Sequence, residues 1–181
     1  RMAQTVTPTA AIPLYGRSAD NIRDHRHVTS LLHRIETTDT GVLVTPTLSF
    51  DERGHQVNHM TYYCVGWSGN GEKPVDFYPT AEDFVGEGGN FERPYAIVKN
   101  AEGVKAGTKI EGLEAVGGLH FSEITLEPEE ECSYLIFTGI TEDIQEIRNL
   151  SKTYTTREKV LEELEKTKAY WQEKVNVAYH T

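Results

Sequence analysis

The sequence has 181 residues, enough for one domain, or one domain with an appendage, whose core needs no disulfide or metal support. Its 28 acidic residues outnumber its 18 basic ones, and the resulting net charge of -10 argues against binding the phosphate backbone of nucleic acids. No apolar run approaches the roughly 20 residues of a membrane span and no secretion signal stands at the start, so we expect a cytoplasmic protein without membrane partners.

The first hundred residues have the composition of β structure. Pro46 has no amide hydrogen to donate, so we expect it at a sheet edge or a bulge. The first two predicted strands are close enough to form a hairpin. Strands are predicted over residues 27–35, 42–50 and 60–67, with turns at 38–41, 51–54 and 68–71.

The middle of the chain is rich in glycine and polar residues. Thr80 followed by Asp83 predicts a capped helical turn near the start of residues 79–94. A glycine-rich loop should follow it, and residues 99–112 should form an exposed loop. Two further strands are then predicted as a hairpin, over residues 119–126 and 132–140 around an acidic turn.

After residue 140 the apolar period changes from two to 3.6, which predicts a short helix over 142–150 and a longer one capped by Thr155 and Glu158. One stripe of the longer helix holds Val160, Leu161, Leu164, Lys168, Trp171 and Val175. The fold class is therefore mainly β: an antiparallel β-sandwich over residues 1–140, followed by a helical linker over 141–181. The chain begins with Arg1 rather than Met, and the apolar stripe of the longer helix needs another surface to pack against. We therefore expect a piece of a larger protein.

A basic, histidine-rich segment, residues 17–34, stands out in this acidic chain with four arginines, two aspartates and three histidines. On an extended chain His25 and His27 share one face, and Asp24 and Arg26 share the other. Guanidinium groups and carboxylates can grip neighbouring sugar hydroxyls, so the segment indicates a carbohydrate site. The alternative is a solvated edge strand with weak surface ion pairs.

Other candidates indicate structure more than chemistry. A metal site could be built from His25 and His27 together with His33, His55 or His59. No Cys or Glu lies at a spacing diagnostic of metal binding, so we expect these histidines to be hydrogen-bonded instead. Residues 86–89 lack the Lys-Ser/Thr of a phosphate-binding loop and favour a turn; substrate contact is the alternative. None of the carboxylates, Asp24, Asp83 and Glu87 included, stands out as a catalytic acid. Five aromatic residues are assigned to the sandwich core, with a platform for a sugar ring as the alternative: Tyr62, Tyr63, Trp67, Phe77 and Tyr78.

The two cysteines, Cys64 and Cys132, match no metal spacing. We expect them to be reduced, buried thiols, with one disulfide as the alternative.

Three segments in this order resemble the N-terminal β-sandwich of glycoside hydrolase family 94 phosphorylases: residues 17–34, residues 77–94 with the pattern F-x-G-x-G…P, and residues 114–128. Within the family the chain is most similar to the 1,2-β-oligoglucan phosphorylases, and next to the phosphorylase-like region of cyclic β-1,2-glucan synthases. The resemblance implies a galactose-mutarotase-like supersandwich that precedes linker helices, an (α/α)6 barrel and a C-terminal β domain.

The resemblance also implies a reaction, the reversible and inverting phosphorolysis of a β-glucoside. Phosphate attacks the anomeric carbon while an aspartate of the barrel protonates the leaving oxygen. No part of this chain matches the barrel, so the resemblance implies no catalytic residue here and no activity of the chain alone. Inorganic phosphate would be a co-substrate of the whole enzyme, and no cofactor is implied.

The partners implied by the resemblance are a β-glucan oligosaccharide, glucose 1-phosphate or phosphate held by the barrel, and a second copy in a homodimer. Sandwich loops would shape the acceptor-sugar side, which points to these substrate-binding residues: Arg17, Asp24, His25, Arg26, His27, Gly88 and Asn90.

Two alternatives stay open, a free-standing carbohydrate-binding sandwich and a mutarotase-like epimerase with a His and a Glu in one cleft. A free-standing module should bury the stripe of Leu161, Leu164 and Trp171, whereas a linker should leave it exposed.

Overall fold

The computed structural model describes residues 2–16, 26–51 and 54–175. Strands dominate these residues, and helices occur near both ends and in the middle. The strands are β1 (Gln4–Val6), β2 (Thr9–Leu14), β3 (Arg34–Thr37), β4 (Gly41–Val44), β5 (Leu48–Asp51), β6 (Gly54–Val57), β7 (Thr61–Ser68), β8 (Asp76–Thr80), β9 (Lys109–Glu111), β10 (Ala115–His120), β11 (Ile124–Leu126) and β12 (Tyr134–Thr141). The helices are α1 (Arg26–Ser30), α2 (Ala81–Val85), α3 (Tyr95–Lys99), α4 (Ile144–Thr153) and α5 (Arg157–Lys174).

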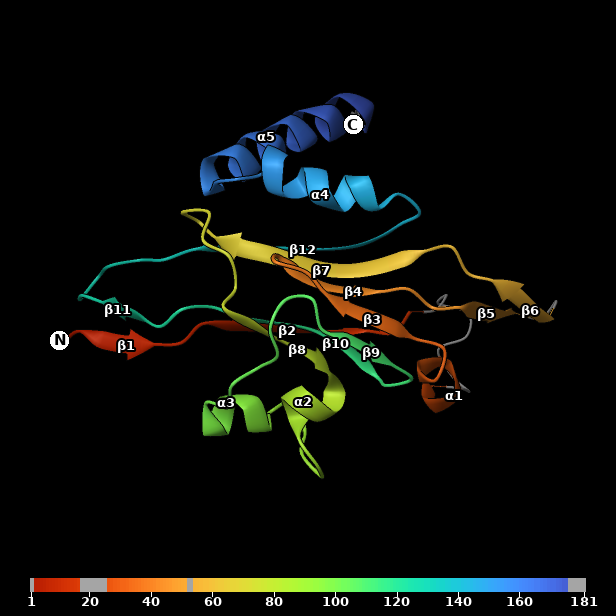
Figure 1. Ribbon diagram of the computed structural model, residues 1–181. Coiled ribbons are helices and arrows are strands. Elements are labelled where there is room, and N and C mark those ends of the chain that lie inside the picture. The colour runs from red at the N-terminus through yellow and green to blue at the C-terminus, as the bar shows by residue number, and fades with distance from the viewer. Residues whose placement is uncertain (1, 17–25, 52–53, 176–181) are drawn as a thin grey trace, which may run out of the picture.

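Two antiparallel sheets stack face to face at the centre of the molecule (Figure 1). The larger sheet has the order β12-β7-β4-β3-β9, and the smaller has the order β2-β10-β8. Alternate side chains of both sheets point into the space between them, because the side-chain period of a strand is two. The core between the sheets consists of Leu14, Ile35, Val42, Val44, Cys64, Phe77, Ala115, Leu119 and Phe121.

Helices cover the outer faces of both sheets, which gives four layers. α4 and the start of α5 pack on the larger sheet over Leu43, Val65 and Trp67, and α2 and α3 pack on the smaller sheet over Tyr78 and Val116. In Figure 1 the first pair of helices lies above the sheets and the second pair lies below them. Double coverage explains why every residue of β4 and of β8 is buried.

The two sheets approach each other closely at Gly117, in the middle of β10. A Cβ atom at this position would overlap the Cβ of Cys64 and would lie 3.3 Å from a methyl carbon of Leu14. Only glycine fits between β10 and β7 at this distance, so Gly117 sets the spacing of the layers here.

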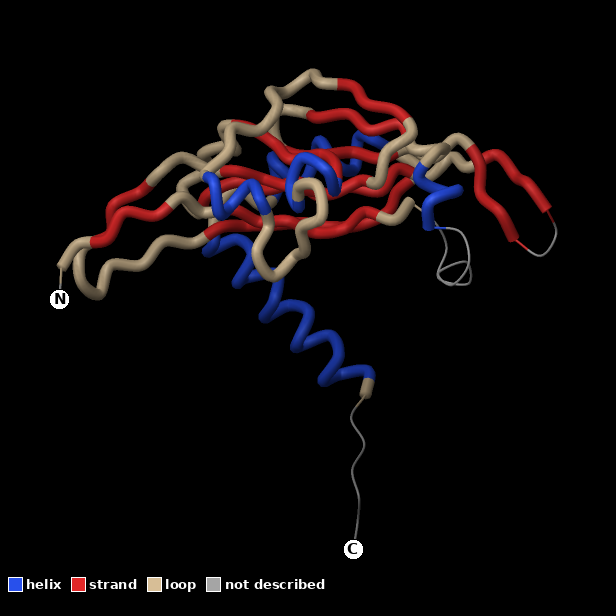
Figure 2. The backbone as a smooth tube through the Cα atoms, turned by 90° about the horizontal axis from the view of Figure 1, so that it is seen from below, coloured by secondary structure: helices blue, strands red, loops and turns tan. Residues whose placement is uncertain are grey.

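Two short ribbons extend from opposite ends of the sandwich (Figure 2). One is the antiparallel pair of β1 and β11, and the other is the pair of β5 and β6. α5 also extends away from the body of the molecule, and its C-terminal part leaves the sheets (Figure 2).

The predicted fold class is confirmed, since the described chain is mainly β with antiparallel sheets followed by helices. The predicted turn at 38–41 joins β3 and β4 in a hairpin. The strand predicted over 60–67 corresponds to β7, and the helix predicted over 142–150 corresponds to α4.

The strand predicted over 27–35 is wrong in its first half. The chain forms α1 there, and the carbonyls of Thr29 and Ser30 accept hydrogen bonds from the amides of Leu32 and His33. Thr29 and Ser30 are buried while Val28 and Leu31 are exposed, the reverse of what the apolar pattern predicts. Local helical hydrogen bonds therefore outweigh the β-branched composition of this segment.

The strand predicted over 42–50 is interrupted. β4 ends at Val44 and β5 begins at Leu48. Pro46, which has no amide hydrogen to donate to a sheet, lies between the two strands. Pro46 itself is fully buried.

The hairpin predicted over 119–126 and 132–140 does not form. β10 pairs with β2 and β8 in the smaller sheet, whereas β12 pairs with β7 in the larger one. The two segments bury their side chains in different places, because Leu119 lies between the sheets and Leu135 lies under α4.

Two smaller expectations also need correction. The N-cap of α5 is Thr156 rather than Thr155, and its side chain makes no capping hydrogen bond. The loop predicted over 99–112 contains the edge strand β9 and a single bridge between Val104 and Phe77.

The thiols of the two cysteines are free, but their environments differ. Burial raises the pKa of Cys64 to about 12, whereas Cys132 is exposed, contrary to the expectation that both are buried. Since the thiolate is the reactive form, we predict that iodoacetamide labels Cys132 in the native protein and leaves Cys64 unlabelled until the protein unfolds. Mass spectrometry of peptides would measure this, and equal labelling of both thiols under native conditions would contradict it.

Candidate functional site

The segment after β8 builds a small lobe on the outer face of the smaller sheet. Thr80 caps α2: its hydroxyl oxygen accepts a hydrogen bond from the amide of Asp83 at 3.0 Å, and the hydroxyl donates to the Asp83 carboxylate at 2.7 Å. This confirms the predicted cap. α2 ends at Gly86, whose φ of 79° lies in the left-handed region, and the side chain of Tyr95 packs directly on this glycine.

Two neighbouring hollows flank α2. The Tyr78 hollow has a volume of about 370 Å³ and lies between α2 and the loop of residues 101–104. The Asn90 hollow has a volume of about 500 Å³ and lies on the glycine-rich side of α2. Both combine aromatic rings with carboxylates, a mixture suited to the apolar faces and hydroxyl groups of sugars. The side chains are Tyr78, Tyr95, Glu82, Asp83, Glu87 and Glu102 in the first, and Phe91, Asn90, Glu82, Glu87 and Glu114 in the second.

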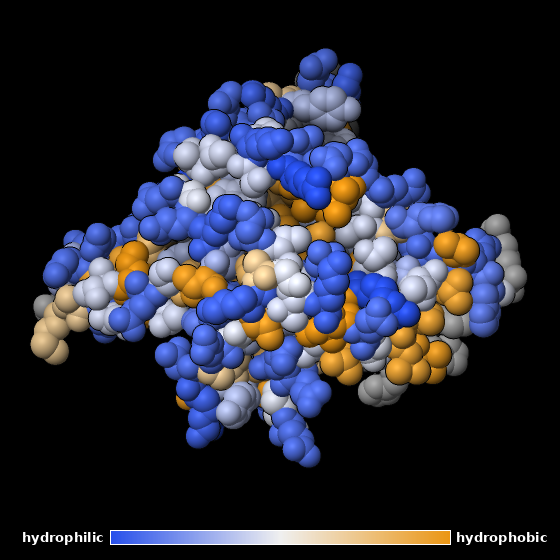
Figure 3. Space-filling view, in the orientation of Figure 1, coloured by the Kyte–Doolittle hydropathy of each residue, from blue (hydrophilic) through white to orange (hydrophobic). Residues whose placement is uncertain are grey.

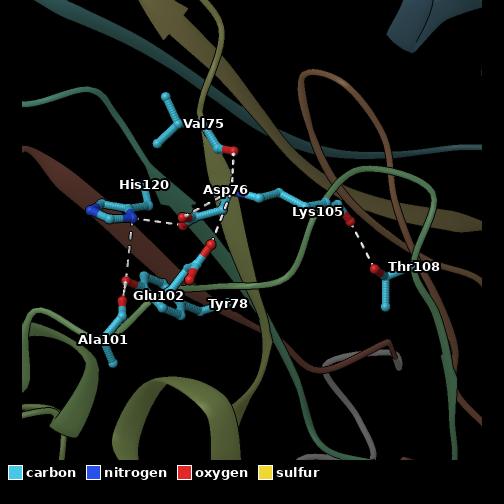
Figure 4. A network of polar contacts seen from close by, with 8 residues as sticks. All are labelled: Val75, Asp76, Tyr78, Ala101, Glu102, Lys105, Thr108 and His120. Carbon is cyan, nitrogen blue, oxygen red and sulfur yellow. Dashed lines mark hydrogen bonds and ion pairs between the residues drawn. The ribbon is translucent and has the colours of Figure 1, made fainter.

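A polar network holds the loop that closes the Tyr78 hollow (Figure 4). The Tyr78 hydroxyl donates to the carbonyl of Ala101 at 2.5 Å. Burial, and next the negative charge of Asp76, raises the pKa of Tyr78 to about 12, so this hydroxyl keeps its proton and remains a donor at neutral pH.

Asp76 is the buried centre of that network. Its carboxylate lies 2.6 Å from Nδ1 of His120 and 3.8 Å from the ammonium of Lys105, which also reaches Glu102 at 3.5 Å (Figure 4). A buried carboxylate is costly unless it is paired, and these partners satisfy it. The network therefore anchors β8, β10 and the loop of residues 101–105 to one another.

Sequence reasoning missed this network. The signal that could have found it is an aspartate at the start of a strand that continues with aromatic residues: Asp76 precedes Phe77, and Tyr78 follows two residues later on the same face.

Five of the seven predicted substrate-binding residues belong to the segment of residues 17–27. Arg17, Asp24 and His25 are outside the described residues. Arg26 and His27 begin α1, so the extended conformation assumed for residues 24–27 is wrong at these two positions. α1 lies on the same side of the sandwich as α2 (Figure 1).

The other two predicted residues, Gly88 and Asn90, lie on the loop after α2. Gly88 has a φ of 70°, and a Cβ atom there would touch nothing, so glycine is needed for its backbone angle. The side-chain oxygen of Asn90 accepts from the amides of Glu92 and Arg93 at 3.0 Å, which leaves its NH2 group for a ligand. Their contact with a sugar stays a prediction.

The opposite side of the molecule has a groove and an exposed helix. The groove, of about 470 Å³, runs between α4 and the β3–β4 turn, with Leu43, Ile144 and Ile147 among its lining residues. Figure 3 shows apolar surface between the helices and the sheet below them, within a largely hydrophilic surface. Along α5 only Val160 packs against the core, whereas Leu161, Leu164, Trp171 and Val175 are exposed.

The structure describes only some of the candidate metal ligands, and His25 lies outside the described residues. No group of three or more His, Cys, Asp or Glu among the described residues is arranged to hold a metal ion. His33, a candidate ligand, directs both ring nitrogens at backbone carbonyls.

No helix among the described residues has both the length and the apolar character of a membrane-spanning segment.

Comparison with known families gives one match. The family described as "Glycosyl hydrolase 94, supersandwich domain" matches residues 7–157. This range covers both stacked sheets, the α2 lobe and α4. A comparison with curated proteins finds none that matches. Because the family match spans most of the chain, the chain belongs to the glycosyl hydrolase 94 family and carries its supersandwich domain.

Proposed function

We propose that this chain is the non-catalytic sandwich and linker portion of an inverting β-glucan phosphorylase, in which it shapes the acceptor-sugar side of the active site. The observation that carries the proposal is the family match over residues 7–157. In this scheme the general acid and the phosphate site belong to another part of the parent protein, the (α/α)6 barrel, and inorganic phosphate or glucose 1-phosphate is the co-substrate.

The exposed stripe of α5 supports the linker role over that of a free-standing carbohydrate-binding module. Leu161 and Leu164 are each almost half exposed, and Trp171 is 57% exposed. A module that works alone should bury such side chains within itself, because exposed apolar patches mark interaction sites. We propose that this stripe packs on the barrel, with residues 1–140 as the sandwich and 141–181 as the linker.

The finer parts of the proposal follow the family resemblance. The acceptor is a β-1,2-linked glucan oligosaccharide, the whole enzyme is a cytoplasmic homodimer, and no cofactor takes part. The sugar would meet the segment of residues 17–27 and the loop with Gly88 and Asn90. α1, which begins at Arg26, and α2, which precedes this loop, lie on the same side of the sandwich (Figure 1).

The first experiment compares the chain with its full-length parent protein. Both are incubated with glucose 1-phosphate and sophorose, and released phosphate is measured. We expect phosphate release from the full-length protein and none from the 181-residue chain. Turnover by the chain alone would overturn its non-catalytic role, and a parent protein inactive on every β-glucan acceptor would overturn the phosphorylase assignment.

In the full-length enzyme we predict that Arg26→Ala raises the acceptor KM at least about tenfold, because a hydrogen bond from a charged donor contributes about 1.5–3 kcal/mol. The control is Arg148→Ala, which removes an exposed arginine from α4 on the opposite side of the sandwich. Steady-state kinetics with varied acceptor would measure both. An acceptor KM that stays at the wild-type value in Arg26→Ala would remove the segment from the sugar site.

A further inference from the structure

β12 forms one edge of the larger sheet, and among the described strands it pairs with β7 only. The amide of Gly66 on β7 donates to the carbonyl of Thr40, so Gly66 directs its backbone groups at β4. These groups alternate in direction along an antiparallel strand, so Val65 directs its own at β12, where it pairs with Phe137. The same alternation turns the backbone groups of the even-numbered β12 residues away from β7.

The outward backbone groups form a row along the open edge of β12. They belong to Tyr134, Ile136, Thr138 and Ile140. Within the part of the chain that the structure describes, no backbone hydrogen bond reaches the amides or carbonyls of these residues. Thr138 is exposed, and Ile140 is 58% exposed. The row spans about 20 Å at the usual rise of a strand, which is room for one more strand.

The other edges of the two stacked sheets are protected against strand addition. β9, at the far edge of the larger sheet, has only three residues, and Lys109 and Glu111 are charged and exposed. In the smaller sheet, β2 contains Pro13, and the outer side of β8 is closed where Phe77 exchanges two backbone hydrogen bonds with Val104. Short length, charge, proline and coverage are the usual protections of an edge. β12 has eight residues without a charge or a proline, so the described chain leaves this edge unprotected.

Acidic residues flank both ends of this open edge. Glu131 lies three residues before β12, Glu142 follows it directly, and both are exposed. Antiparallel pairing of two β12 strands about a two-fold axis would bring Glu131 of each copy close to Glu142 of the other. Like charges on paired strands are destabilising, so a second copy fits this edge poorly. A strand with Lys or Arg at both ends complements the edge.

We infer that the open edge of β12 binds an extended segment of another protein, which adds to the larger sheet as an antiparallel strand. The segment is uncharged in its centre and carries Lys or Arg at both ends. Hydrogen bonds to the four outward residues supply the affinity, and the carboxylates of Glu131 and Glu142 select the basic ends. The inference goes beyond the proposed function and does not rest on it.

Hydrogen exchange in the 181-residue chain, followed by NMR, tests the edge itself. The amides of Ile136 and Thr138 should exchange rapidly, whereas those of Phe137 and Gly139, which face β7, should exchange slowly. The probe is the synthetic peptide Lys-Lys-Thr-Val-Thr-Ile-Thr-Val-Lys-Lys. At saturation it should slow exchange at Ile136 and Thr138 at least about tenfold. Slow exchange of these two amides in the free chain would overturn the inference.

Calorimetric titration with matched peptides tests the mode of binding. Two derivatives of the probe carry N-methyl groups on alternate residues, one set on each edge of the peptide strand. One derivative should bind and the other should not, because only one edge of the peptide faces β12. Equal binding of both derivatives would contradict strand addition.

The same titration tests the role of charge. Replacing the four lysines of the probe with glutamates should weaken binding at least about tenfold in wild type, and by less in Glu131→Gln/Glu142→Gln. Equal affinities of the two peptides for wild type would overturn the selection of basic ends.

Thr138→Pro tests the position of the added strand. It removes an outward amide and leaves the hydrogen bonds to β7 in place, so it should weaken peptide binding, whereas the control Thr138→Val should retain it. Equal affinity in folded Thr138→Pro would overturn the inference. If Thr138→Pro does not fold, hydrogen exchange in the wild type still decides the question.

Two further measurements distinguish other occupants of the edge. A dimer in sedimentation analysis whose formation slows exchange at Ile136 and Thr138 would identify a second copy as the occupant and overturn the inference. Slow exchange of the same two amides in the isolated full-length parent would identify a strand of the parent protein and overturn it as well. Phosphorylase activity is measured separately, so failure of the proposed function leaves these results standing.

Discussion

Replacing Trp67 with alanine is expected to lower the free energy of unfolding of this chain by about 3–5 kcal/mol, the usual cost of deleting a large buried aromatic side chain. Trp67 on β7 is 3% exposed and stacks on Phe137 with ring centroids 5.1 Å apart. Its indole N–H donates to the carbonyl of Tyr154 at 2.8 Å. Since Tyr154 lies at the junction of α4 and α5, the substitution should also loosen both helices from the sheet.

Urea unfolding followed by far-ultraviolet circular dichroism would measure this loss, with two matched variants for comparison. Trp67→Phe keeps an aromatic ring in the stack and removes the hydrogen bond, so it should cost less than Trp67→Ala. Trp171→Ala removes the other tryptophan, which is exposed on α5, and should change stability by less than about 0.5 kcal/mol. Similar losses at both tryptophans would mean that α5 packs on the body along its whole length.

Replacing Gly117 with alanine should destabilise the chain by about 3 kcal/mol, at the upper end of the usual cost of overpacking a core. Glycine in a strand normally destabilises a protein relative to alanine, so the predicted sign is opposite to the intrinsic one. The reason is the overlap between the added Cβ and the Cβ of Cys64 on the facing sheet. Neither backbone can withdraw without separating β10 from β2 or β7 from β4.

The matched control is Gly139→Ala on β12, where the added Cβ meets the hydroxyl end of the Tyr63 side chain at 2.5 Å. A flexible side chain can move aside, so this variant should cost less than Gly117→Ala. Pairing Gly117→Ala with Cys64→Gly removes the opposing Cβ, and the two changes should together cost less than the sum of the single changes. Strict additivity in urea unfolding would refute close approach at this position as the cause.

The parts of the fold that were predictable from sequence depend on local signals. The change of period after residue 140 indicates α4 and α5, and the Thr80–Asp83 pair indicates the start of α2; both are present. Turn residues at 38–41 mark the start of β4, and turn residues at 68–71 mark the end of β7. Each of these signals arises within a few residues of chain, which is why a single sequence reveals it.

The parts that were not predictable depend on contacts between distant segments. β2 and β8 acquire their strand character by pairing with β10, and no local pattern in residues 9–14 indicates it. The apparent hairpin after residue 119 is wrong for the same reason, because neighbouring segments were assigned to each other instead of to partners far away in sequence.

The candidate site was predictable in part. The glycine-rich loop was recognised, although Asn90 also has a structural role in its own turn, which its sequence position does not indicate. The candidate ligand histidines were expected to be hydrogen-bonded instead, and His33 is; His120, for which no prediction was made, is hydrogen-bonded as well. Which atoms they contact depends on Leu113 and Asp76, residues brought near by the sheets.

The pairing of β1 and β2 with strands more than a hundred positions later has a consequence for synthesis on the ribosome. Gln4 pairs with Leu126 and Thr9 pairs with His120, so β1 and β2 leave the exit tunnel long before the strands with which they pair have been translated. Nascent chains should therefore expose unpaired strand edges for many seconds at about 5–20 residues per second, and we expect chaperone binding during that interval.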